Sequence, residues 1–177
     1  MANIDTVVQL FEEVANAMLV DDNTVPIPNQ IAPTFIYDRV SGINGNVSKT
    51  YPAILLDSQP NTDRKSTTST FLPRVNCYEL KLFVYDTYNT DQKVTANLNR
   101  SLSAKQSKVE LIINQYIAEV QRRALSLPAY NGIQIENIQT VDGFLAKDVH
   151  NSKLVQAYYK IIICVPSNCV NGTFVYP

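Results

Sequence analysis

The sequence lacks tryptophan and has only one histidine, three cysteines and five glycines. So few glycines leave no glycine-rich phosphate loop, and no GxSxG nucleophile motif is present. Cys77, Cys164 and Cys169 have no CxxC spacing, and with His150 as the only histidine they lack the paired ligands of a zinc site. We therefore expect no metal and no cofactor. Cys77 and Cys164 stand in apolar segments and are interpreted as small hydrophobic core residues.

Charge is also scarce. Charged residues make up 18% of the chain, against about 25% in ordinary soluble domains. Acidic and basic residues number 16 and 15, so no net field draws the whole protein to nucleic acid or to a membrane. No apolar run approaches the ~18 residues that a membrane span requires, and the N-terminus has no basic leader. We expect a soluble protein, made in the cytoplasm, whose polar surface suits contact with other proteins.

Two segments show helical periodicity. The first predicts an amphipathic helix over about 3–20, from apolar residues at Ile4, Val7, Val8, Phe11, Val14, Ala15 and Met18. The second lies within 91–125, a run without glycine or proline, and has an apolar stripe at Val109, Ile112, Ile113, Tyr116, Ile117, Val120 and Ala124. Capping-box patterns at Ser103 and Ser107 predict its start, with residues 90–102 as a further turn or two.

The remaining periodic segments predict strands at 33–40, 50–59, 75–86, 132–141 and 153–166. One face of the last strand is wholly apolar, so we expect it near the middle of the sheet. The order of elements predicts a single α+β domain over 1–177, with a mainly antiparallel sheet of about four to five strands and two helices packed on one face. Long loops are expected at 41–50, 59–74 and 142–152, and long loops in compact domains usually have a function.

The strand YELKLFVYD contains Glu79 and Lys81, two residues apart, and Asp57 lies upstream. In nucleases of the PD-(D/E)xK class such residues bind Mg²⁺ and activate water. In this sequence, however, Leu56 rather than proline precedes Asp57, and a short x-Lys pattern often occurs by chance. A half-exposed antiparallel strand produces the same alternation without any catalysis. The sequence leaves both interpretations open and favours the second.

Asp86 and Asp91 are the first and last residues of the segment DTYNTD, which begins at the end of this strand. They are either paired carboxylates or residues that build the turn into the next helix. Aspartate and asparagine are common in turns and caps because their side chains bond to nearby backbone groups. We therefore expect a turn here.

Several of these segments together resemble the neck and tail-completion proteins of tailed bacteriophages, which have the tail-terminator-like fold. The resemblance lies in the N-terminal helix, the YPAILLD strand, ELKLFVYDTYNTDQ leading into SLSAKQSKVELIINQYIAEV, and the closing strands IQIENIQTV and KLVQAYYKIIICV. It covers most of the chain and rests on pattern and order rather than on a diagnostic motif. In its high content of asparagine and threonine, the chain also resembles a ring protein of a crAss-like phage.

The resemblance implies a structural virion protein without catalytic residues. Such proteins assemble as homo-oligomeric rings between portal or adaptor and tail proteins, with loops that contact neighbouring subunits and a channel through which DNA passes without specific recognition. It implies a location in the neck or tail of the virion, after assembly in the host cytoplasm. The candidate subunit-interface residues are Arg64, Lys65 and Phe71 in the 59–74 arm, and Glu79 and Lys81 on the strand. Arg64 and Lys65 are explained more simply by a solvated loop.

Overall fold

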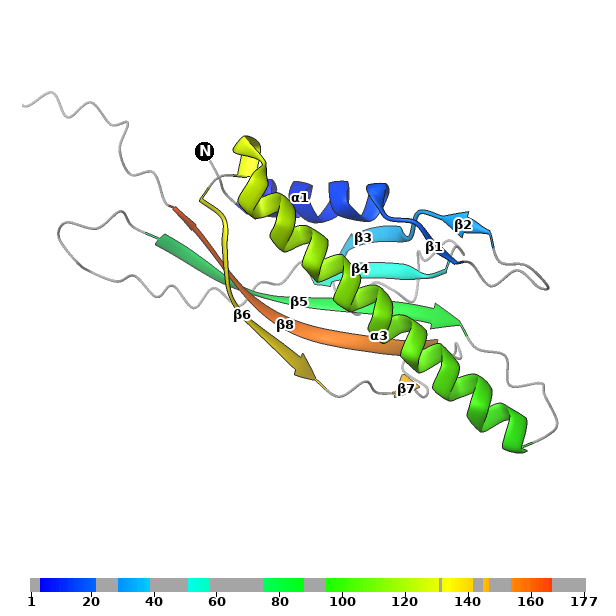
Figure 1. Ribbon diagram of the computed structural model, residues 1–177. Helices are drawn as coiled ribbons and strands as arrows, with labels where there is room; N and C mark the ends of the chain where they lie inside the picture. Colours follow the sequence, from blue (N-terminus) through cyan, green and yellow to red (C-terminus); the bar gives the residue numbers. More distant parts are fainter. Residues whose placement is uncertain are drawn as a thin grey trace, which may run out of the picture.

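The protein consists of a β-sheet with both long helices on one of its faces (Figure 1). The helices are α1 (Ile4–Ala17) and α3 (Thr95–Ser126). This arrangement confirms the predicted α+β class and the placement of two helices on one side. The computed structural model describes residues 4–21, 29–38, 51–57, 75–87, 95–130, 132–141, 145–146 and 154–166.

The sheet has the strand order β3-β4-β5-β8-β6, with the short β7 attached to β8. Its strands are β3 (Thr34–Asp38), β4 (Ala53–Asp57), β5 (Val75–Thr87), β6 (Gln134–Val141), β7 (Leu145–Ala146) and β8 (Leu154–Pro166). β8 lies between β5 and β6, which confirms its expected place in the interior of the sheet. A separate two-stranded sheet, β1 (Val20–Asp21) with β2 (Gln30–Ile31), was not predicted.

β3 and β4 pair in parallel, and the other strand pairs in the described part of the chain are antiparallel. A parallel pair needs a crossover of about a dozen residues or more, whereas an antiparallel pair can be joined by a tight turn. The segment between Asp38 and Ala53 is long enough for such a crossover. The sheet is thus mainly antiparallel, as expected, with one parallel edge.

The capping boxes predicted at the start of α3 were wrong, whereas the further helical turns expected within 90–102 are present from Thr95 onward. The helix begins at Thr95, so Ser103 and Ser107 lie in its interior rather than at its N-terminus. Its end is well marked: the short 3₁₀ helix η2 (Pro128–Tyr130) follows, and Gly132 then adopts a φ of 92°. That conformation strongly favours glycine, because a side chain would clash with the backbone. Likewise α1 ends at Ala17 rather than near residue 20, because Val20 enters β1.

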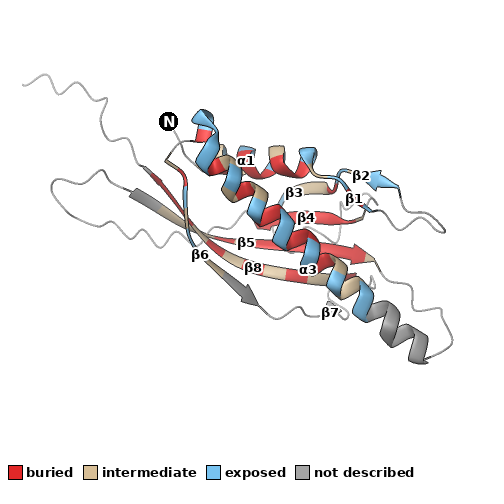
Figure 2. Ribbon diagram, in the orientation of Figure 1, coloured by how far each residue is buried: buried red, intermediate tan, exposed pale blue. Residues whose placement is uncertain are grey.

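The main core lies between the helices and the sheet (Figure 2). The six residues predicted to share one face of β8 all belong to it: Val155, Ala157, Tyr159, Ile161, Ile163 and Val165. α1 and α3 contact each other through Phe11 and Tyr116, whose rings meet edge to face with centroids 5.9 Å apart. The Tyr116 hydroxyl donates a hydrogen bond of 2.6 Å to the Phe11 carbonyl oxygen. This bond satisfies a hydroxyl that has no access to water.

The expectation that Asp86 forms a turn was wrong. Asp86 lies within β5, points to the helix side and is fully buried. Its Oδ2 lies 3.4 Å from Lys105 Nζ and 3.1 Å from Lys108 Nζ, both on α3. A buried carboxylate requires such partners because desolvation penalises its charge. Asp91 lies outside the described residues.

Candidate functional site on the helix-free face of the sheet

Among the described residues, no helix lies on the sheet face opposite α1 and α3; this face is the candidate functional surface, and we call it the helix-free face. Because side chains alternate along a strand, the residues of β5 that neighbour the core residues Leu80, Leu82 and Val84 point to this face. The strand pairings extend it across the sheet. Its central members are Ile36, Asp38, Leu55, Asp57, Cys77, Glu79, Lys81, Phe83, Tyr85, Tyr158, Lys160 and Cys164.

One half of the helix-free face is an aromatic and aliphatic cluster. Phe83 stacks on Tyr158 of β8 with centroids 4.5 Å apart and an interplanar angle of 8°, and on Tyr85 at 5.9 Å and 14°. Leu55 and Leu154 pack with these rings and are buried. A second, smaller core therefore lies on the face opposite the helices.

The other half of the face carries charges in a row across the strands. Asp38 pairs with Asp57 between β3 and β4, and Lys81 pairs with Lys160 between β5 and β8. Leu56 pairs with Leu82, so the next position along both strands places Asp57 opposite Lys81. The row thus runs from two acids on β3 and β4 to two bases on β5 and β8.

Glu79 joins this row diagonally. Its Oε1 lies 2.9 Å from Lys160 Nζ, and the hydrogen bond from Lys160 to Glu79 raises the pKa of the lysine above its ordinary value. Burial raises the pKa of Tyr85, and the negative charge of Asp57 adds to that effect. Burial likewise raises the pKa of Tyr158. Lys160 therefore stays cationic and both tyrosines stay protonated near neutral pH, so the tyrosines can donate hydrogen bonds.

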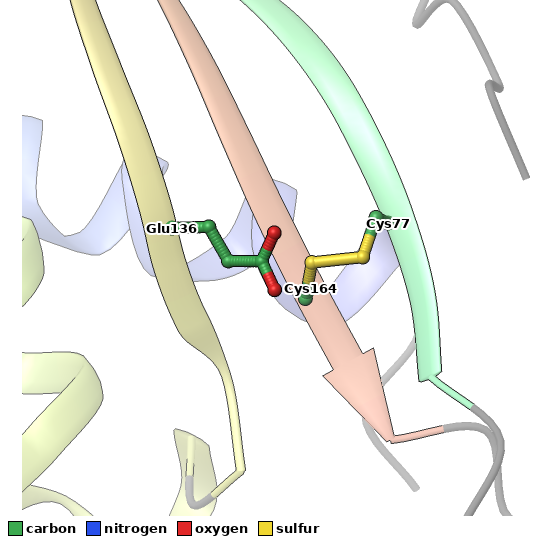
Figure 3. Close-up of side chains that lie close together, drawn as sticks. All are labelled: Cys77, Glu136 and Cys164. Carbon is green, nitrogen blue, oxygen red and sulfur yellow. A yellow bond between two sulfur atoms is a disulfide. The ribbon is translucent and has the colours of Figure 1, made fainter. Parts of the chain in front are cut away.

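The interpretation of Cys77 and Cys164 as simple core residues was wrong, because the two form a disulfide between β5 and β8 (Figure 3). They are direct cross-strand neighbours with Cα atoms 4.0 Å apart. The register of β6 shifts between Ile135 and Asn137, where Glu136 is the extra residue. The Glu136 carboxylate points toward the disulfide, and one of its oxygens and both sulfurs lie within 4.8 Å of one another.

The structure brings Asp57, Glu79 and Lys81 onto one face, as the nuclease interpretation requires. Asp57 is nevertheless buried, and the Glu79 carboxylate is occupied by Lys160. The other candidate residues, Arg64, Lys65 and Phe71, lie outside the described residues, as do the 41–50 and 59–74 loops. Within the 142–152 loop, β7 returns to the sheet and pairs with the start of β8.

Sequence reasoning missed the disulfide and the approach of Glu136. The alternation of side chains along a strand places Cys77 on the same face as Glu79. It places Cys164 on the side of the last strand that does not carry the apolar residues. The pairing of the two cysteines depends on the register between strands far apart in the sequence, with 87 residues of separation. Neither spacing nor composition reveals that register.

The chain was compared with protein-family models and with curated proteins, and no family model and no curated protein matches it. In the part of the chain that the structure describes, no helix is long and apolar enough to cross a membrane.

Proposed function

We propose that this chain is a non-enzymatic structural subunit of the neck or tail of a tailed bacteriophage. Copies of it assemble into a ring that joins portal to tail. The fold class and the order of elements, α1-β3-β4-β5-α3-β6-β8, agree with those that the resemblance implies. The observation that supports the proposal is the helix-free face, on which the partly exposed side chains of Glu79, Lys81, Lys160 and Tyr158 lie over a buried aromatic cluster.

This surface suits contact between proteins for two reasons. Tyr158 stays partly exposed above the buried rings of Phe83 and Tyr85, and a tyrosine offers contact area together with a polar handle. Glu79, Lys81 and Lys160 are partly exposed charges of both signs, which another copy can meet with complementary charge. Glu79 and Lys81 therefore remain the candidate interface residues, together with Lys160.

The oligomeric state tests the proposal directly. Size-exclusion chromatography with light scattering, followed by electron microscopy, is expected to show closed rings, alone or after addition of the neighbouring neck protein. Glu79→Lys reverses one charge of the row and is expected to weaken assembly. Glu12→Lys makes the same change at an exposed position of α1 and serves as the matched control. Absence of the chain from purified phage particles would refute the proposal.

A second candidate function is a Mg²⁺-dependent nuclease that uses Asp57, Glu79 and Lys81. The observation in its favour is that all three side chains lie on one face, with Asp57 across from Lys81. Incubation with plasmid DNA and Mg²⁺, beside Lys81→Ala, separates the two functions. We expect no cleavage. Metal-dependent cleavage that is lost in Lys81→Ala would instead establish the nuclease.

A further inference from the structure

Among the described residues, Cys77, Cys164 and Glu136 form a cluster that the proposed function does not use (Figure 3). Three different strands supply it: β5, β8 and β6. The inserted residue of a β-bulge brings the carboxylate to the sulfurs, and bulges commonly redirect a side chain in this way. A carboxylate has no favourable charge interaction with a neutral disulfide. Its position therefore suggests a role when the two cysteines are reduced.

We propose that these three residues form a redox-gated site for a thiophilic divalent cation such as Zn²⁺. In the oxidised chain the disulfide leaves only the single negative charge of Glu136. In the reduced chain, two thiolates and one carboxylate would concentrate three negative charges, which a divalent cation offsets. The inference concerns chemistry that the proposed ring function does not use, and it stands independently of that function.

The chemical steps are a thiol–disulfide exchange followed by metal binding. A dithiol reductant gives up two electrons and two protons and becomes a disulfide, while the Cys77–Cys164 bond breaks to give two thiols. Binding of the cation then displaces both thiol protons to solvent, because the thiolate is the ligand. Two sulfurs and one carboxylate oxygen supply three ligands, which leaves a fourth tetrahedral position for water.

The geometry suits this set of ligands. Zinc binds sulfur at about 2.3 Å and carboxylate oxygen at about 2.0–2.2 Å. In the oxidised chain the two bonded sulfurs and the Glu136 oxygen lie within 4.8 Å of one another, so after reduction the sulfurs need only move apart for one ion to contact all three atoms. Cys164 is 1% exposed, while Cys77 is partly exposed and Glu136 is exposed. The site is therefore anchored in the sheet on one side and accessible to a cation from the other.

Cadmium is the probe for the test, because thiolate-to-Cd²⁺ charge transfer absorbs in the ultraviolet. All proteins carry Cys169→Ser, so that the third cysteine cannot exchange with the pair. We expect the reduced chain to bind one Cd²⁺ and the oxidised chain to bind none. Glu136→Gln is expected to weaken binding by roughly tenfold or more, since even groups that only support a metal ligand change affinity by about 10–100-fold.

Glu12→Gln, at an exposed carboxylate on α1, is the matched control and is expected to leave Cd²⁺ affinity unchanged. Circular dichroism of the reduced chain establishes whether the sheet persists. Equal affinity of the Glu136→Gln variant and its parent would overturn the proposal, because thiols in an unfolded or unrelated arrangement would bind without Glu136. Failure of the reduced chain to bind Cd²⁺, or equal binding by the oxidised chain, would also overturn it.

Discussion

Lys108 Nζ on α3 lies 3.1 Å from Oδ2 of Asp86, a carboxylate on β5 with no exposed side-chain surface. Lys105 approaches the same oxygen at 3.4 Å, one helical turn earlier. Both lysines keep about a fifth to a quarter of their side-chain surface exposed, so their methylene stems cover the sheet while their ammonium groups reach inward. This pairing fixes the position of α3 along β5.

Because either lysine alone can offset the Asp86 charge, we expect Lys105→Met and Lys108→Met each to cost about 1 kcal/mol or less of unfolding free energy. The double variant is expected to cost about 3 kcal/mol, because loss of the charges that compensate a buried carboxylate is strongly destabilising. Urea denaturation of all four proteins measures this coupling. Strictly additive losses would contradict the shared role of the two lysines.

The contact between Tyr116 and Phe11 joins the two helices across 105 residues of sequence. Tyr116→Phe removes the hydroxyl that donates to the Phe11 carbonyl and is expected to cost about 1 kcal/mol. Tyr116→Ala also leaves a cavity and is expected to cost about 3–5 kcal/mol. Chemical denaturation provides the measurement, with Tyr37→Phe at an exposed position as the control. A negligible loss for Tyr116→Ala would show that the helices do not depend on this contact.

The Cys77–Cys164 disulfide closes a long segment of chain and restricts the unfolded state. Reduction is expected to lower the unfolding free energy by about 2–4 kcal/mol, the usual contribution of a native disulfide. Urea denaturation with and without reductant, in a Cys169→Ser background, tests this. A variant with both Cys77→Ser and Cys164→Ser should not respond to reductant. Equal stability of the oxidised and reduced parent would contradict the prediction.

Glu119 accepts hydrogen bonds from Arg122 and Arg123 on α3, and these bonds lower its pKa from 4.5 to about 2. The lowered pKa means that the folded protein gains stability from the ionised form. That contribution is fully present above about pH 4.5 and is lost as the pH falls toward 2. Because the side chain is partly exposed, we expect less than about 1 kcal/mol.

The carboxyl carbon of Glu119, followed by NMR from pH 6 to below pH 2, checks this prediction. Its midpoint is expected near 2, and Glu119→Gln is expected to flatten the stability profile below about pH 4.5. A midpoint at the ordinary value of a glutamate would show that the two arginines do not hold the carboxylate in solution.

The fold class was predictable because it depends on periodicity. Val7, Phe11 and Val14 recur at helical spacing, and Ile161 and Ile163 alternate as strand residues do. The faces of the strands were predictable for the same reason, so Glu79 and Lys81 were correctly placed away from the helices. The start of α3 was not predictable, because the segment between Thr95 and the predicted cap at Ser103 is compatible with both helix and turn.

The sequence alone determined the two long helices and the five longer strands, apart from their ends, and which side of each strand faces the core, because these follow from local spacing. Only the tertiary structure decided the register between strands, since backbone hydrogen bonds pair any two strands with little regard to side chains. That register joined Cys77 to Cys164 and brought Glu136 beside them. The packing of α3 on the sheet brought Lys108 to Asp86. The parallel pairing of β3 with β4 was decided in the same way, by the path of the chain rather than by its local pattern.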